Sequence, residues 1–248
     1  MTDSTLRLDL ALVARDLVKS RAKAQNLIAE GRVSVDGTVM TKPTRKVTED
    51  MDITVATPEI DWVGRGARKL LQALDHFAVD PKEKIAIDVG ASTGGFCQVL
   101  LENGAERVYA VDVGHGQLDP MIAEDSRIVN LEKTNARNLD HSLIPEPIDL
   151  IVADVSFISL TKALPASLTL VAPGAHLLAL VKPQFEVGKG NVGKGGIVRD
   201  PELVATVPIE LENWINGQAG WTSLGMIKSP ILGSDGNIEF LLGARYEN

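Results

Sequence analysis

From Lys84 to the end of the chain, short apolar runs alternate with stretches of helical periodicity, and this alternation constrains the fold more than any other feature. The apolar runs include IAIDV, VYAVDV, DLIVADV and LLALV. Such runs, separated by helices, are typical of strands that are buried on both faces of a parallel sheet. We therefore predict an α/β, Rossmann-like doubly wound sheet that binds ligands beyond the carboxyl ends of its strands.

The first sixty residues have a different pattern, which predicts a small α+β unit. A first helix is expected to present one apolar face, made of Leu8, Leu10, Leu12, Val13 and Leu17. Ser20 is a predicted N-cap for a second helix that ends at Gly31, and Asp36-Gly37 predicts a hairpin turn, with DITVA as a further strand. We predict a small domain over 1–60, a linker over 61–67 and the large domain over 68–248.

Composition bounds the class of protein. The 248 residues include a single cysteine, Cys97, so an internal disulfide is excluded. Neither a secretory signal nor an apolar run of membrane-spanning length is found in the sequence. These features predict a cytoplasmic protein without a membrane partner. They leave the oligomeric state open, and a monomer is compatible with them.

Charge is unevenly distributed along the chain. From Arg7 to Lys46 there are nine lysines and arginines against four acids, although the whole chain carries a net charge of −8. The segregation predicts a basic module attached to an acidic body, because the local field decides where phosphates approach. Ordinary surface charge is the alternative interpretation.

A glycine-rich turn, DVGASTGGF, follows the first strand of the large domain and predicts a nucleotide-type ligand. Asp112 ends the next strand, where a carboxylate can bind both ribose hydroxyls of an adenosine. The turn lacks the G-x-G-x-x-G spacing, and its own Asp88 would repel a pyrophosphate, so S-adenosylmethionine is favoured over NAD. Asn135 is at a usual position for adenine contacts, although turn capping explains it equally well. The predicted cofactor residues are Asp88, Gly90, Ser92, Thr93, Gly94, Gly95, Phe96, Asp112 and Asn135.

Two charged residues end neighbouring apolar runs beside that turn. Asp154 follows LIVA and Lys182 follows LLALV. Taken singly, a strand-end Asp is usually a loop cap and a strand-end Lys usually extends into water. The occurrence of both residues at the predicted ligand edge is less ordinary, and it makes Asp154 and Lys182 candidates for the chemistry. Lys69 and Glu239 are two further candidates.

The segment FEVGKGNVGKGG has the Gly-x4-Gly-Lys spacing of a P-loop, but ATP binding is rejected. Gly195 stands where a P-loop needs Ser or Thr, and the next helix is expected to begin only after Asp200. We predict instead a mobile cationic flap over 188–196, in which Lys189 and Lys194 contact RNA.

Two resemblances extend this interpretation. The first sixty residues resemble the S-four RNA-binding domain through Arg7-Leu8-Asp9, Ser20-Arg21, Ala24-Gln25, Leu27-Ile28, Gly31-Arg32-Val33, Val35-Asp36-Gly37 and Lys42-Pro43. In that family basic residues contact the phosphates of structured RNA, which implies such roles for Arg7, Arg21, Lys23, Arg32 and Lys42.

The whole chain resembles the TlyA family, historically labelled hemolysin A, through DVGASTGGF, ADVSFISL, LVKPQFE and KGGIVRD. The resemblance implies an S-four domain joined to an FtsJ-like methyltransferase domain that methylates cytidine 2′-hydroxyls of ribosomal RNA. It also implies that ribosomal RNA or ribosomal subunits are the partner. The implied catalytic set is Lys69, Asp154, Lys182 and Glu239.

A ribose 2′-hydroxyl must lose its proton as the new bond forms, and Lys182 is the candidate base. A mainly electrostatic role for Lys182, stabilising a developing alkoxide, stays open. No metal is expected. A non-catalytic RNA-binding factor on the same scaffold and a membrane-lytic protein are the competing hypotheses.

Overall fold

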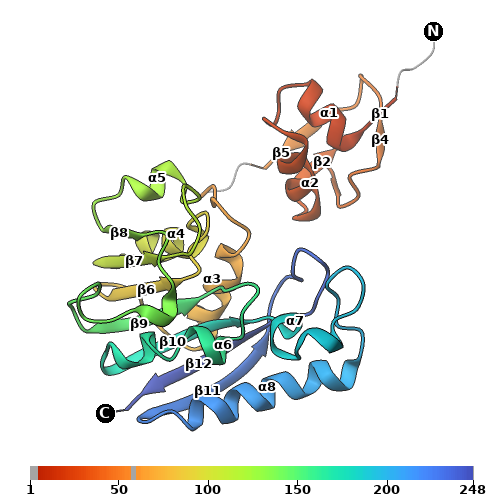
Figure 1. Cartoon of the computed structure of the whole chain (residues 1–248). Coiled ribbons are helices and arrows are strands. Elements are labelled where there is room, and N and C mark those ends of the chain that lie inside the picture. The colour runs from red at the N-terminus through yellow and green to blue at the C-terminus, as the bar shows by residue number, and fades with distance from the viewer. Residues whose placement is uncertain (1–4, 57–59, 248) are drawn as a thin grey trace. The chain divides into compact units, whose positions relative to one another are not determined.

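The computed structural model describes residues 5–56 and 60–247. The chain divides into two compact units, residues 1–61 and 62–248, which Figure 1 colours from red to blue along the chain. Trp62 and Val63 pack against the core of the second unit. The assignment of 61–67 as an interdomain linker remains a prediction.

The first unit is the predicted α+β arrangement. Its elements are β1 (Leu6–Arg7), α1 (Leu8–Ala14), α2 (Arg21–Ala29), β2 (Val33–Val35), β3 (Thr38–Met40), β4 (Lys46–Val47) and β5 (Ile53–Val55). The hairpin and the strand DITVA are confirmed, because β2 pairs antiparallel with both β3 and β5. Ser20 caps α2 by accepting a hydrogen bond from the Lys23 backbone N–H, and Gly31 follows the helix with φ +68°.

The predicted apolar face of the first helix is confirmed for Leu8 and Leu12 and wrong for Leu10 and Leu17. Leu8, Ala11 and Leu12 are buried, whereas Leu10 and Leu17 are 39% and 41% exposed. The helix is only seven residues long, so Leu17 lies beyond it, and the spacing 8, 11, 12 forms its buried stripe. Asp9 is buried on the same helix, because cationic neighbours compensate its charge.

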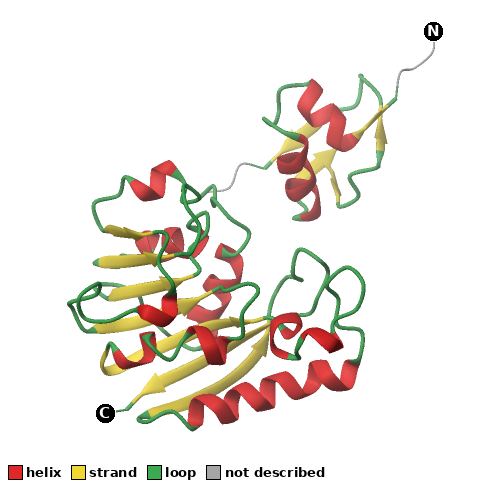
Figure 2. Ribbon diagram, viewed as in Figure 1, coloured by secondary structure: helices red, strands yellow, loops and turns green. Residues whose placement is uncertain are grey.

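The second unit is a seven-stranded sheet with helices on both faces, as Figure 2 shows. Its strands are β6 (Ile85–Val89), β7 (Arg107–Val111), β8 (Ile128–Leu131), β9 (Ile148–Ala153), β10 (Val171–Val181), β11 (Trp221–Lys228) and β12 (Phe240–Tyr246). Its helices are α3 (Ala67–His76), α4 (Gly95–Glu102), α5 (Pro120–Ala123), α6 (Leu160–Ala163), α7 (Pro183–Glu186) and α8 (Pro201–Asn216), with short 3-10 turns η1 (Ala136–Asn138), η2 (Ser167–Thr169) and η3 (Lys189–Asn191).

The strand order is β11-β12-β10-β9-β6-β7-β8. Strands β10, β9, β6, β7 and β8 are mutually parallel, and β12 is antiparallel to both of its neighbours. The predicted doubly wound α/β sheet is therefore confirmed. Only β12 runs against the other strands of this sheet.

Alternate residues of each strand serve two separate cores. One face packs on α3 and α4 through residues such as Leu70, Leu100 and Leu178. The other face packs on α6 and α8 through residues such as Leu164 and Leu211. With both faces covered, the carboxyl edge of the parallel strands is the place left for a ligand.

Candidate active site

The turn after β6 defines the centre of the site. Gly90 has φ +88°, and a Cβ atom there would lie 2.6 Å from the backbone oxygen of Asp154. Only glycine fits such a close approach between the ends of β6 and β9. The turn then leads through Gly94, at the N-cap of α4, into that helix.

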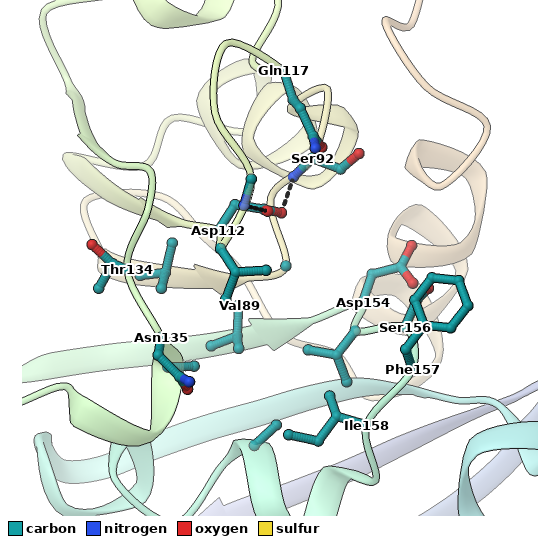
Figure 3. Close-up of a pocket in the computed structure, with 17 residues that line it drawn as sticks. Val89, Ser92, Asp112, Gln117, Thr134, Asn135, Asp154, Ser156, Phe157 and Ile158 are labelled. Carbon is teal, nitrogen blue, oxygen red and sulfur yellow. Dashed lines mark hydrogen bonds between the residues drawn. The ribbon is translucent and has the colours of Figure 1, made fainter. Parts of the chain in front are cut away.

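A cavity of about 580 Å³ opens at this edge, within the range typical of small-molecule sites. Four of the predicted cofactor residues line it: Gly90, Ser92, Asp112 and Asn135. In Figure 3, Thr134 and Asn135 lie on one side, Asp154, Ser156 and Phe157 lie on the other, and Val89 lies between them. The described residues that line the cavity include two carboxylates, those of Asp112 and Asp154, and no lysine or arginine. The wall of the cavity is therefore acidic.

Asp112 is held firmly at the top of the cavity. Its two carboxylate oxygens accept hydrogen bonds from the backbone N–H groups of Ser92 (2.9 Å) and Gly114 (2.7 Å), as the dashed lines in Figure 3 show. Each oxygen keeps a further acceptor position. Asn135 caps η1 by accepting from Arg137 N–H, which confirms the capping role. It also lines the cavity, so the adenine contact stays a prediction.

A smaller pocket of about 250 Å³ adjoins the cavity and shares Gly90, Ser92, Asp154 and Ser156 with it. Its other lining residues include the predicted Thr93, Gly95, Phe96 and Lys182, together with Arg65. Because the two spaces share these residues, a ligand in the large cavity would lie next to a group that enters the small pocket beside Lys182.

Asp88 does not line either of these two pockets, contrary to the role expected for it on the cofactor wall. The carboxyl group is fully buried, and its Oδ2 accepts a hydrogen bond from the Cys97 thiol, with Sγ 3.0 Å away. Its Oδ1 has no hydrogen-bond partner among the described residues. Burial raises the pKa of Asp88 to about 7, and the nearby Asp154 carboxylate adds to this shift.

The four residues of the predicted catalytic set form two ion pairs. Lys182 Nζ lies 2.5 Å from Asp154 Oδ1 and donates to Ser156 Oγ at 2.9 Å. Lys69 Nζ lies 2.5 Å from Glu239 Oε2, and both side chains are more than nine-tenths buried. Both pairs thus join residues that are far apart in the sequence.

The fold brings both pairs to one edge of the sheet. Val181 pairs with Phe240 in the β10–β12 ladder, so Lys182 and Glu239 are the next residues beyond that pair. Gly66, whose carbonyl accepts from Lys69 N–H, is so close to Asp154 that a Cβ atom there would lie 3.4 Å from Oδ2. The structure therefore assembles all four residues beside the turn that follows β6.

The glycine-rich segment after β10 is not a P-loop. Gly193 and Lys194 precede no helix directly, and α8 begins at Pro201 with Asp200 accepting from the N–H groups of Glu202 and Leu203. The predicted helix start is confirmed. Lys194 is exposed, and the side chain of Lys189 lies outside what the structure describes.

The side chain of Asn237 holds the end of the glycine-rich segment by hydrogen bonds, and this role was not predicted from the sequence. Its buried amide donates to Gly196 O at 2.8 Å and accepts from Val198 N–H at 3.1 Å. Asn237 is two residues before Glu239. Turn residues such as Asn are common, and nothing in the local pattern NIEFLLG distinguishes this one.

Phe157 and Ser156 were also missed, although they lie in the quoted motif ADVSFISL. The Phe157 side chain is 92% exposed and has φ 67°, an uncommon conformation for an aromatic residue. Its ring lies 5.2 Å, centroid to centroid, from that of Phe185. An exposed aromatic ring beside Asp154 offers a stacking surface.

The candidate RNA-binding residues of the first unit have distinct surroundings. Arg7 and Arg21 both donate to Asp9, and Lys23 Nζ lies 2.5 Å from Asp61. Arg32 lies 3.6 Å from Glu30. Lys42 lines a surface pocket of about 300 Å³ with Arg45, which sequence reasoning had counted only as charge.

Within residues 5–56 and 60–247, no helix has both the length and the apolar character needed to cross a membrane. The same residues contain no cluster of three or more His, Cys, Asp or Glu side chains arranged to hold a metal ion.

Comparisons with known proteins agree with this geometry. The family model for FtsJ-like methyltransferases matches residues 62–246, and the model for the S4 domain matches residues 6–53. The chain is 46% identical over 240 residues to the 16S/23S rRNA (cytidine-2'-O)-methyltransferase TlyA of Mycobacterium tuberculosis, covering 96% of this chain and 89% of that protein.

Two further relatives cover nearly the whole chain. Hemolysin A of Brachyspira hyodysenteriae is 39% identical over 239 residues, which are 95% of this chain and 98% of that protein. A solved structure provisionally named a hemolysin from Streptococcus thermophilus is 34% identical and has a TM-score of 0.70, covering 100% of this chain and 90% of that one.

The raised pKa of Asp88 predicts a pH-dependent stability. Because the folded state holds this proton up to about pH 7, the contribution of Asp88 to stability falls as the pH rises from the unfolded value near 4 to about 7. In Asp88→Asn the side chain does not ionise, so the variant does not lose this stability as the pH rises. We expect the free energy of unfolding of the variant, relative to wild type, to rise by roughly 2–3 kcal/mol between pH 5 and pH 8.

Denaturant unfolding of the ligand-free full chain at the two pH values measures this difference. Asp80→Asn, at a carboxyl on an exposed turn, is the matched control. An equal relative stability of Asp88→Asn at both pH values would contradict the raised pKa.

Proposed function

The chain belongs to the TlyA family of FtsJ-like methyltransferases, and from that premise we propose that it methylates a cytidine ribose 2′-hydroxyl in ribosomal RNA, with S-adenosylmethionine as the donor. The observation that carries the proposal is the shared wall between the acidic cavity and the pocket that holds Asp154 and Lys182. A donor in the first and a ribose in the second would meet there.

The residues of the large cavity suit S-adenosylmethionine. A cationic sulfonium and an ammonium group favour a cavity lined by Asp112 and Asp154, whereas a pyrophosphate would need positive charge. Gly90, Ser92, Asp112 and Asn135 would hold the cofactor, which when bound supplies an electrophilic methyl group.

The chain's own residues would then orient and deprotonate the hydroxyl. Lys182 lies in the small pocket, held by Asp154 and Ser156, so its Nζ has a fixed direction. As the ammonium of the ion pair, Lys182 would stabilise the developing alkoxide; to accept the hydroxyl proton instead, it would first have to give up a proton and act as the neutral amine. Lys69 and Glu239 would position the adjoining backbone and limit the net charge of the site.

The RNA would be bound by both units. The S4 domain supplies basic residues for the phosphates of structured RNA, which is recognised mainly by shape and backbone. The segment 188–199 would close over the RNA as a cationic flap with Lys189 and Lys194, and Phe157 would stack a base beside the pocket. A ribosomal substrate implies a cytoplasmic location for the protein.

Methyl transfer tests the proposal. Wild-type protein, tritiated S-adenosylmethionine and isolated small or large ribosomal subunits should give labelled RNA, with the label on a cytidine ribose after digestion. Lys182→Ala should lower the turnover number by at least about 100-fold, since it removes the group that handles the proton or the developing charge. Lys82→Ala, on an exposed turn, should leave the rate unchanged.

Failure of the wild type to label either subunit, with RNA binding intact, would favour the non-catalytic RNA-binding factor. Permeabilisation of lipid vesicles by the pure protein, again without labelling, would favour the activity in the name Hemolysin A of one relative.

The flap hypothesis gives a separate prediction for Asn237. Asn237→Ala removes both side-chain bonds that fasten 196–198, so proteolytic cleavage between Gly188 and Gly196 should accelerate by about tenfold. In the wild type, bound ribosomal subunits should suppress the same cleavage. Asn103→Ala, which removes an amide bonded to Val99 O at the end of α4, is the matched control. Cleavage within 188–196 that RNA does not slow would contradict closure.

A further inference from the structure

Asp9 is the most heavily engaged side chain of the first unit. Its carboxylate is fully buried and accepts from Arg7 Nε and Nη2, both at 3.0 Å, and from Arg21 Nε and Gln25 Nε2, both at 2.9 Å. Arg7 immediately precedes α1, and Arg21 and Gln25 belong to α2. One carboxylate therefore joins the starts of both helices.

The two guanidinium groups are neighbours. Arg7 Nη2 and Arg21 Nε both donate to the same oxygen, Asp9 Oδ2, so these nitrogen atoms lie no more than about 6 Å apart. Both arginine side chains remain partly exposed, at 38% and 53%. Arg7 uses two of its five N–H donors on Asp9, and Arg21 uses one.

The charges in this cluster do not balance. One carboxylate faces two guanidinium groups, which leaves one positive charge and most of the donors of Arg21 directed away from Asp9. A packing role alone would not need this arrangement, because an apolar residue usually stabilises a core position as well as a buried ion pair does. An incoming phosphate would supply the second negative charge and acceptors for the spare donors.

We propose that Asp9 is a positioning residue that holds Arg7 and Arg21 as a preformed two-arginine clamp for RNA phosphate. This inference rests on the proposed RNA-directed function. It adds the arrangement of side chains by which the first unit would bind the phosphates of its substrate. The clamp lowers the cost of binding, because each arginine otherwise loses rotamer entropy when a phosphate orders it.

The clamp is not a pH switch. Hydrogen bonds from Arg7, opposed by burial and helped by those from Gln25 and Arg21, hold the pKa of Asp9 well below its usual range. The carboxylate stays ionised at any pH at which the protein works, so the arginines stay oriented.

The decisive variant is Asp9→Asn in the full chain, because charge and geometry predict opposite results. The change adds one positive unit to a basic module, so simple electrostatics predicts tighter RNA binding. Loss of the clamp predicts binding to isolated ribosomal subunits that is weaker by about tenfold, with a smaller dependence on salt concentration. In methyl transfer the KM for subunits should rise while kcat stays unchanged.

Asp16→Asn is the matched control, because it makes the same change in charge at an exposed position of the same unit. It should leave the affinity unchanged or slightly higher. In an Arg7→Gln, Arg21→Gln background, Asp9→Asn should not weaken binding further, since the arginines through which it acts are gone and only the loss of a negative charge is left. Further weakening there would overturn the proposal, as would unchanged or tighter binding by Asp9→Asn alone.

A thermal melt decides whether Asp9→Asn is folded. If it is not, Arg21→Lys keeps the charge but lacks the guanidinium fork. It should then bind subunits about tenfold more weakly, and wild-type affinity in this variant would overturn the proposal. Because these measurements read RNA binding directly, absence of methyl transfer by the wild type would refute the proposed enzymatic function without deciding the clamp.

Discussion

The antiparallel pairing of β12 with β10 is the constraint on which the arrangement of the site depends. Residues that precede a strand of a parallel sheet lie at the edge opposite the ligand. Glu239 directly precedes β12, and only because this strand runs against its neighbours does Glu239 reach the edge where β9 and β10 end. There it meets Lys69 from the first turn of α3, closing an ion pair between residues 170 positions apart.

The two ion pairs of the site differ in burial, and we infer from the difference that one pair is structural and the other faces the substrate. Lys69 and Glu239 are 7% and 3% exposed, whereas Lys182 and Asp154 are 12% and 24% exposed. Removing one member of the more buried pair would leave an uncompensated charge in the protein interior, at a cost of about 3–5 kcal/mol. The more exposed pair lines the small pocket and is therefore the pair assigned to the ribose hydroxyl in the proposed function.

The sequence predicted what depends on local pattern and missed what depends on partners distant along the chain. The strand ends at Asp154 and Lys182, the turn at Gly90 and the cap at Asp200 follow from apolar periodicity and turn chemistry. The burial of Asp9 on α1 was not predicted, because two of its partners, Arg21 and Gln25, lie on another helix. The burial of Asp88 depends on how α4 packs its Cys97 against β6, and the roles of Phe157 and Asn237 depend on tertiary position alone.

The net charge of a protein does not decide where a polyanion binds, because at physiological salt charges more than about 8 Å apart are largely screened. On the proposed function, the nine lysines and arginines between Arg7 and Lys46 would attract phosphates despite a net charge of −8. On the proposed function, an unfavourable charge contact would arise in the small pocket, where the RNA backbone would approach the Asp154 carboxylate. Lys182 and Arg65 line the same pocket and offset the charge of Asp154, whereas Asp112 lines the large cavity alone and keeps that cavity acidic. The two adjoining spaces thus present opposite electrostatic environments, one suited to a cationic donor and one to an anionic acceptor strand.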